Sequence, residues 1–149
     1  MKGIADMSAA EVVAALRLEP HPEGGFYRET FRDPDPPGGR GAMTSILYLL
    51  ELGEVSAWHR VDAVEAWSFH AGDPLVLTIS ENGHDAASYH LGPDISRGQH
   101  PQVIVPKGAW QTAESLGRWT LVGCVVAPAF RFEGFELAPP DWRPRPRGL

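Results

Sequence analysis

Two stretches of the sequence decide its fold class: Val55-Ser56-Ala57-Trp58-His59-Arg60-Val61 and Glu65-Ala66-Trp67-Ser68-Phe69. Residue character alternates along both, and a period of two is typical of β-strands, in which side chains two positions apart share a face. One face of the first stretch is then made by Val55, Ala57, His59 and Val61. One face of the second is made by Glu65, Trp67 and Phe69.

Further strand candidates lie on both sides of these stretches. They are short, apolar or aromatic, and bounded by turn residues, and they cover residues 26–31, 44–50, 75–79, 87–91, 103–105, 109–113 and 119–126. Asn82-Gly83 separates two of them and predicts a hairpin, because both positions of the tight turn require positive φ. About eight to ten short strands with regular turns favour a β-sandwich or barrel over alternating β/α units. The sequence therefore predicts an all-β fold.

The two ends of the chain differ from this middle part. Ser8 and Glu11 have the spacing of a capping box, in which the two side chains satisfy free amides of the first helical turn, so one short helix is predicted over residues 8–18. Residues 140–149 are rich in arginine and proline and are predicted to form a flexible tail. At 149 residues the chain has the length of one domain, whose β part is expected at 24–137.

Composition excludes several classes of function. The net charge of −6 argues against non-specific nucleic-acid binding, which depends on Lys and Arg contacts to phosphates. A single cysteine, Cys124, excludes an internal disulfide and a cysteine-based zinc cluster. The sequence has no apolar run long enough to span a bilayer and no signal-peptide pattern at its start. We therefore expect a cytoplasmic protein that binds neither membrane nor nucleic acid.

Chemistry concentrates in two segments, His59-x5-Glu65-x6-Gly72 and Pro106-x-Gly108-x2-Gln111. The alternation turns His59 and Glu65 inward, and the turn at 106–108 delivers Gln111 to a neighbouring strand. Polar groups inside a small barrel cost free energy unless they are paired, so they either satisfy one another or serve a ligand.

These segments resemble degraded versions of the two cupin motifs, in which a His-x-His, a following Glu and a later His hold a metal inside a jelly roll. The closer match is the Cupin_5 family, also known as DUF985. The segments that carry this match are 20–30, with its Pro-Glu-Gly-Gly-aromatic block, then 59–60, 65–67, 71–75, 105–111 and 130–137. The resemblance implies a jelly roll, often a homodimer, and kinship in shape to deoxysugar epimerases.

The chain departs from the metal-binding pattern at two positions. Val61 stands where the second His is expected, and Gln111 stands where the last His is expected. A carboxamide is a poor ligand for transition metals, so His59, Glu65 and Gln111 form at best a degenerate site for a divalent metal, and no cofactor is expected. Two other interpretations remain open. The three side chains form a structural polar cluster, or they line a metal-free pocket in which His59 is the general acid or base and Glu65 orients it.

Three more residues are candidates for ligand binding. Trp67 shares the inner face with Glu65 and is predicted to stack on a ligand. Arg28 and Glu29 reach either the mouth of the barrel or a partner subunit, or else form a solvated pair. The leading hypothesis is a small-molecule-binding cupin, metal-independent and isomerase- or epimerase-like, that acts on a sugar-like or carboxylate metabolite. The alternatives are a metal-dependent oxygenase or lyase and a non-catalytic metabolite-binding protein.

Overall fold

The structure is a computed structural model that describes residues 3–146. Its helices and strands follow along the chain in this order: η1 (Ile4–Asp6), α1 (Ala9–Leu16), β1 (Glu19–Pro20), β2 (Phe26–Arg32), β3 (Thr44–Glu51), β4 (Val55–Val61), β5 (Val64–Gly72), β6 (Leu75–Ser80), β7 (Ala87–Leu91), η2 (Ile95–Arg97), β8 (Gln102–Val105), β9 (Trp110–Ser115), β10 (Trp119–Ala127), η3 (Phe132–Gly134) and β11 (Phe135–Leu137).

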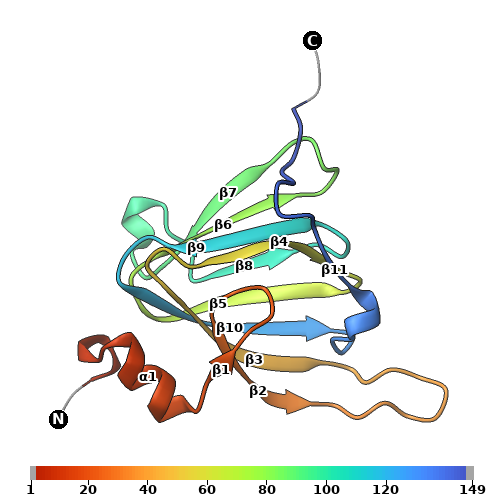
Figure 1. Cartoon of the computed structure of the whole chain (residues 1–149), viewed down its shortest axis with the longest axis horizontal. Helices are drawn as coiled ribbons and strands as arrows, with labels where there is room; N and C mark the ends of the chain where they lie inside the picture. The colour runs from red at the N-terminus through yellow and green to blue at the C-terminus, as the bar shows by residue number, and fades with distance from the viewer. Residues whose placement is uncertain (1–2, 147–149) are drawn as a thin grey trace.

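The strands form two antiparallel sheets that pack against each other as a jelly-roll β-sandwich (Figure 1). One sheet has the order β1-β2-β3-β10-β5-β8, and the other has the order β11-β4-β9-β6-β7. The all-β fold class with one short N-terminal α-helix is therefore confirmed. No helix within residues 3–146 has the length and apolar character needed to cross a membrane.

The core lies between the sheets and continues beneath the helix. Its central cluster includes the fully buried Trp67 and Tyr48. A second cluster places Val12 of α1 against Trp119 of β10. The capping box predicted from the sequence is present, since Glu11 N–H donates to Ser8 Oγ and Ser8 N–H donates to the Glu11 carboxylate. The helix thus covers one part of the first sheet. The polar part of the interior does not lie beneath it.

Strand β4 departs from the predicted alternation. Its register against β9 shifts between Ser56 and His59, so that two residues of β4 oppose one residue of β9. This β-bulge turns both Ser56 and His59 inward, whereas Val55 is exposed. The prediction that Val55 shares a face with His59 was therefore wrong, because an extra residue in one strand reverses the alternation on one side of it.

The hairpin at Asn82-Gly83 forms by a different turn from the one predicted. Strands β6 and β7 pair antiparallel as expected, but residues 81–86 connect them. Gly83 has a positive φ, and Asn82 does not. Instead, the Asn82 carboxamide oxygen accepts hydrogen bonds from the N–H groups of His84 and Asp85. The side chain of Asn82 therefore closes a wider loop.

The C-terminal segment packs against the second sheet, in contrast to the flexible tail predicted over 140–149. The Trp142 ring lies 4.5 Å from that of Trp110 and 5.4 Å from that of Trp58. Arg145 N–H donates to the Gly83 carbonyl, and Arg145 O accepts from the His84 ring. Aromatic contact thus anchors a segment whose composition alone suggests disorder. Residues 147–149 lie outside the described part of the chain.

Candidate functional site

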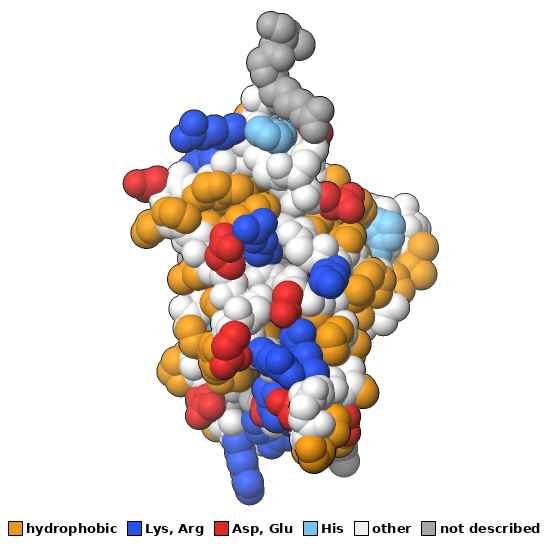
Figure 2. Space-filling model, turned by 90° about the vertical axis from the view of Figure 1, so that its right-hand side faces the viewer, with side chains coloured by type: hydrophobic (Ala, Val, Ile, Leu, Met, Phe, Trp, Pro, Cys, Tyr) orange, Lys and Arg blue, Asp and Glu red, His pale blue; other side chains and the backbone are white. Residues whose placement is uncertain are grey.

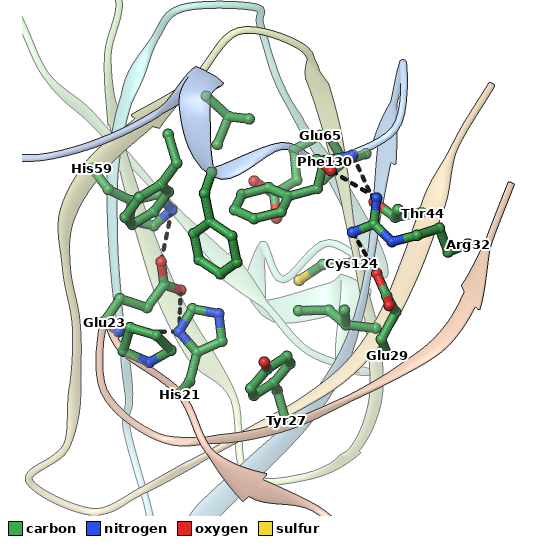
Figure 3. Close-up of a pocket in the computed structure, with 16 residues that line it drawn as sticks. His21, Glu23, Tyr27, Glu29, Arg32, Thr44, His59, Glu65, Cys124 and Phe130 are labelled. Carbon is green, nitrogen blue, oxygen red and sulfur yellow. Dashed lines mark hydrogen bonds and ion pairs between the residues drawn. The ribbon is translucent and has the colours of Figure 1, made fainter. Parts of the chain in front are cut away.

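A cavity of about 160 Å³ lies in the interior of the sandwich (Figure 3). Its walls combine charged and imidazole groups with apolar and aromatic ones. The lining residues are His21, Pro22, Glu23, Tyr27, Glu29, Arg32, Thr44, Ile46, His59, Val61, Glu65, Cys124, Val126, Phe130, Phe132 and Phe135. The volume is below the 300–1,000 Å³ typical of sites for drug-sized ligands, so the cavity suits a small metabolite.

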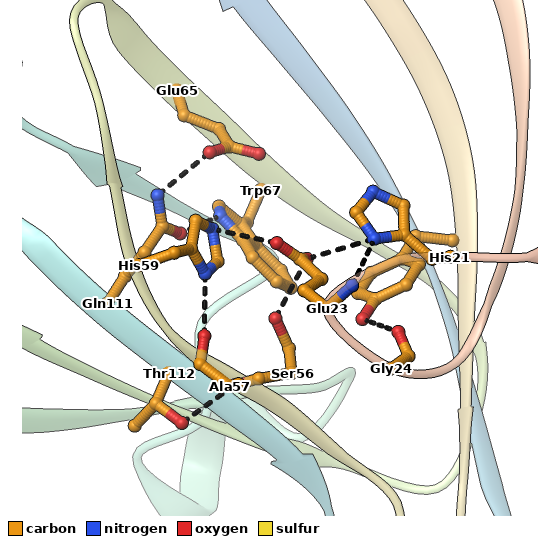
Figure 4. A network of polar contacts seen from close by, with 11 residues as sticks. His21, Glu23, Gly24, Ser56, Ala57, His59, Glu65, Trp67, Gln111 and Thr112 are labelled. Atoms are coloured by element: carbon orange, nitrogen blue, oxygen red, sulfur yellow. Dashed lines mark hydrogen bonds and ion pairs between the residues drawn. The ribbon is translucent and has the colours of Figure 1, made fainter. Parts of the chain in front are cut away.

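Glu23 is the centre of the first polar cluster in this interior (Figure 4). Its carboxylate lies 3.2 Å from His59 Nε2 and accepts a hydrogen bond of 2.8 Å from Ser56 Oγ. All three side chains are buried. The bulge in β4 is what allows Ser56 and His59, three positions apart, to reach the same carboxylate.

The loop that carries Glu23 is fixed by backbone contacts on both sides. Ala57 N–H donates to the Glu23 carbonyl, and the Tyr48 hydroxyl donates to the Gly24 carbonyl. Gly24 has φ +110°, and a Cβ there would lie 2.3 Å from the Val55 carbonyl oxygen. Only glycine fits this close approach, which explains the Gly-Gly pair after Glu23. The loop therefore holds its carboxylate in place without a regular strand.

The geometry around His59 places one proton between its ring and Glu23. His59 Nδ1 lies 2.7 Å from the Ala57 carbonyl oxygen, which can only accept, so Nδ1 carries a hydrogen. Nε2 then faces the Glu23 carboxylate at 3.2 Å, a contact that is favourable only with a proton between the two atoms. The pair consists of imidazolium and carboxylate, or of imidazole and carboxylic acid. It is a ready proton donor and acceptor beside a cavity.

Glu65 belongs to a second polar cluster. Gln111 Nε2 donates to Glu65 Oε1 at 2.8 Å, and the Trp67 indole N–H donates to Gln111 Oε1 at 2.9 Å. Trp67 and Gln111 are each 1% exposed, and neither lines the cavity. Gln111 thus links a buried indole to a carboxylate that does face the cavity.

Burial changes the protonation of the groups around this carboxylate. Desolvation raises the pKa of Glu65 to about 6, a shift that the nearby His59 opposes and Glu23 adds to. Burial also raises the pKa of the Cys124 thiol, which therefore stays protonated. Desolvation lowers the pKa of His21, whose Nδ1 accepts a hydrogen bond from Glu23 N–H and so carries no proton. Glu65 is thus a group beside the cavity whose pKa lies near physiological pH.

The mouth of the cavity contains a bulge in β2. The register between β2 and β3 shifts between Glu29 and Phe31, which brings Glu29 and Arg32 to the same cavity. Their side chains form an ion pair at 2.7 Å, and Arg32 also donates to the Phe130 carbonyl. Arg28, the other residue predicted here, is exposed and does not line the cavity.

The structure brings together only part of the predicted set. His59, Glu65 and Glu29 line one cavity, Gln111 and Trp67 lie behind Glu65, and Arg28 lies outside it. Sequence reasoning missed Glu23 and His21, because neither lies on an alternating strand. The signal that was present is the block His21-Pro22-Glu23-Gly24-Gly25, which the resemblance used but to which no chemistry was assigned.

The side chains do not offer a ligand set for the metal that cupins commonly hold. Both ring nitrogens of His59 are engaged, by Ala57 O and Glu23. The Gln111 carboxamide is committed at both ends, to Trp67 and to Glu65. Among residues 3–146, no group of three or more His, Cys, Asp and Glu side chains is arranged to hold a metal ion. These side chains therefore do not fit a bound metal ion.

Comparisons with known proteins agree with this fold. The fold is similar to that of the oxalate decarboxylase of Bacillus subtilis, with a TM-score of 0.63 over 79% of this chain and 29% of that one, at 15% identity. At such low identity the likeness shows the fold alone. The model of Cupin_5, described as cupin superfamily (DUF985), matches residues 10–138, and the chain belongs to this family.

Two solved structures are similar over most of their length. Protein SO0799 from Shewanella oneidensis is 39% identical, with a TM-score of 0.83 over 89% of this chain and 85% of that one. A hypothetical protein from Leishmania major is 31% identical, with a TM-score of 0.80 over 89% of this chain and 88% of that one. No curated protein matches the chain.

Proposed function

We propose that this cupin binds a small polar metabolite in its interior cavity and moves a proton on it without a metal, as an isomerase or epimerase does. The observation that carries the proposal is the 3.2 Å contact between His59 Nε2 and the carboxylate of Glu23, two residues that line the cavity together. In this scheme His59 Nε2 and the Glu23 carboxylate exchange a proton with a carbon or hydroxyl of the ligand.

Glu65 supports the same proposal as a second proton-transfer group. It lines the same cavity, and its pKa of about 6 allows it to donate or accept a proton near neutral pH. Two titratable centres held by different partners suit isomerisation, because one can remove a proton while the other delivers one. In this proposal Glu65 is a second proton carrier, whereas the sequence predicted that it orients His59.

Deuterium exchange tests this proposal without knowledge of the natural substrate. A panel of aldoses, ketoses and keto sugars is incubated with the protein in D2O, and mass spectrometry follows deuterium entering carbon-bound positions. We expect one or more ligands to gain deuterium with the native protein. The His59→Gln and Glu23→Gln variants should lower the rate by about 100-fold or more, the usual contribution of a general acid–base group. The exposed His90 provides a matched control, His90→Gln, which should exchange normally.

Three other outcomes identify the alternatives. A ligand that binds the native protein but never gains deuterium would indicate a non-catalytic metabolite-binding protein. Exchange that a chelator abolishes and an added divalent metal restores would indicate a metal-dependent enzyme. Exchange that survives both substitutions would contradict the assignment of the proton to this pair.

We also propose that the protein is a homodimer. The short β1 covers only Phe26 and Tyr27 of β2, so the rest of that edge is open among the described residues, and Phe31 on it is 51% exposed. Open strand edges are commonly covered by a second chain. Light scattering should give twice the chain mass of 16.3 kDa, and a monomer at micromolar concentration would contradict this. The cytoplasmic location stays a prediction of the sequence.

A further inference from the structure

The charges that line the cavity cancel in pairs, with one exception. Glu23 is balanced by His59 at 3.2 Å, and Glu29 is balanced by Arg32 at 2.7 Å. His21 accepts a hydrogen bond at Nδ1 and is neutral, and the Cys124 thiol is protonated. Glu65 remains: it is 7% exposed, and no basic side chain among residues 3–146 forms an ion pair with it. The cavity thus carries about one uncompensated negative charge when Glu65 is ionised.

A buried carboxylate of this kind costs free energy unless something neutralises it. Glu65 is stabilised in its ionised form by His59, which is already paired with Glu23, and by hydrogen bonds from two neutral groups, the Gln111 amide and the Cys124 thiol. Desolvation raises the pKa of Glu65, and the charge of His59 opposes this only in part. A cationic ligand would provide the missing partner, and it would do so in a desolvated site where the interaction is strong.

Another part of the cavity wall is aromatic. It is formed by Phe130, Phe132 and Phe135. The ring centroid of Phe130 lies 5.3 Å from that of Phe132 and 5.8 Å from that of Phe135, and the ring planes are steeply inclined to each other. Phenylalanine faces attract ammonium groups through the ring quadrupole, and several rings together form the usual cage for such groups. Aromatic rings beside a carboxylate are a common combination for a small organic cation.

The charged groups that line the cavity also disfavour anionic ligands. Arg32 is the one arginine or lysine that lines the cavity, and its guanidinium is already bound to Glu29 and to the Phe130 carbonyl. Around the molecule, arginines are also paired with acids, as in Arg40–Asp62 and Arg60–Glu136. Figure 2 shows blue Lys and Arg side chains lying next to red Asp and Glu side chains on one face. A carboxylate or phosphate entering the cavity would meet Glu65 without a free cation to offset it.

We propose that the ligand of this cavity carries an ammonium group, which is neutralised by Glu65 and contacted by the phenylalanine wall. This inference rests on the proposed function and narrows its ligand: of the sugar-like and carboxylate-bearing classes predicted from the sequence, it keeps a sugar-sized molecule and removes the carboxylate. The ligand class is a small polar amine.

Three sugars of one ring size test the charge directly. Glucosamine, glucose and glucuronate differ in carrying a positive, zero or negative charge, and isothermal titration measures their affinity for the native protein at neutral pH. We expect glucosamine to bind at least about tenfold more tightly than glucose, which corresponds to about 1.4 kcal/mol, and glucuronate to bind weakest. Choline and its uncharged carbon isostere 3,3-dimethylbutan-1-ol form a second matched pair and should differ in the same direction.

The variant Glu65→Gln keeps the shape of the side chain and removes its charge, so it should lose the preference for the amine while still binding glucose. Glu114→Gln removes the same charge from an exposed position of β9 and should leave the preference unchanged. A preference that persists in Glu65→Gln, equal affinity for the three sugars, or tighter binding of glucuronate would overturn the inference.

These outcomes are separate from the test of the proposed function. Neutral-sugar binding with no charge preference overturns the ammonium assignment and leaves the His59–Glu23 proton pair standing. If none of the probes binds, the ammonium assignment is also wrong, and the proposed function is then decided by the deuterium exchange alone, which does not depend on these probes.

Discussion

The interior of this barrel contains two polar clusters of similar size that are built on different principles. In the cluster of Glu23, His59 and Ser56, a carboxylate meets an ionisable ring, and a proton between them belongs to neither alone. In the cluster of Glu65, Gln111 and Trp67, a carboxylate meets a neutral amide that is itself held by an indole. The first cluster pairs two ionisable side chains, and the second holds in place a single carboxylate, whose pKa is about 6.

The difference between the two clusters lies in Gln111, which stands where the cupin pattern has a histidine. Gln111 cannot titrate, so it fixes the donor and acceptor directions of its neighbours. The ionisable ring of the interior, His59, is instead paired with Glu23 at 3.2 Å.

The largest effect should come from breaking the ionisable pair. His59→Ala leaves the buried Glu23 carboxylate with the hydrogen bond from Ser56 and a 4.0 Å contact to the His21 ring, and removing one member of a buried pair costs about 3–5 kcal/mol of unfolding free energy. Urea denaturation at neutral pH measures it. His90 is exposed, so His90→Ala should change stability little. A comparable loss of stability in that variant would show that the cost does not come from breaking the His59–Glu23 pair.

Breaking the second cluster should have a smaller effect because no ion pair is lost. Gln111→Leu removes the donor to Glu65 and the acceptor of the Trp67 indole, and two unsatisfied buried groups together cost about 2–4 kcal/mol. Thermal unfolding checks this against Gln102→Leu, an exposed glutamine on β8 whose loss should be nearly neutral. Stability equal to that of the native protein would show that Gln111 is not a structural link.

The charge of Glu65 gives a pH-dependent prediction. Its pKa rises from 4.5 to about 6 on folding, so the stability it contributes is complete below pH 4.5 and is lost as the pH rises through about 6. Glu65→Gln should therefore be more stable than the native protein by about 2 kcal/mol above neutral pH and equal to it in acid. Melting curves across this pH range, with Glu114→Gln as the control, test the prediction, and a constant difference at every pH would refute it.

The smallest effect should come from Ser56→Ala. This substitution removes one hydrogen bond to Glu23 and leaves the ion pair intact, so the loss should be about 1 kcal/mol. Measured in the His59→Ala background, the same substitution should cost more, because Ser56 then provides the remaining short hydrogen bond to the carboxylate. Additive losses in the double variant would show that the three side chains do not act as one cluster.

The sequence predicted the fold more fully than the site. All nine strands suggested by alternation and turn residues exist, and the capping box marks the helix, because these signals are local. Only β1 and β11, of two and three residues, escaped. Glu23 was missed because a loop has no periodicity, and Ser56 was placed on the wrong face because nothing in the residues around Ala57 marks a bulge.

The bulge in β4 also determines which residue controls the protonation of His59, namely Ala57. The ring's Nδ1 hydrogen is oriented by the carbonyl of Ala57, and the N–H of the same residue holds the Glu23 backbone. Both contacts are made by main-chain atoms of a residue that is already alanine, so an alanine scan would pass over it. The tautomer of the site is thus inaccessible to side-chain mutagenesis. An amide-to-ester replacement of the Ala57–Trp58 linkage, which weakens that carbonyl as an acceptor, is the kind of chemical edit that would reach it.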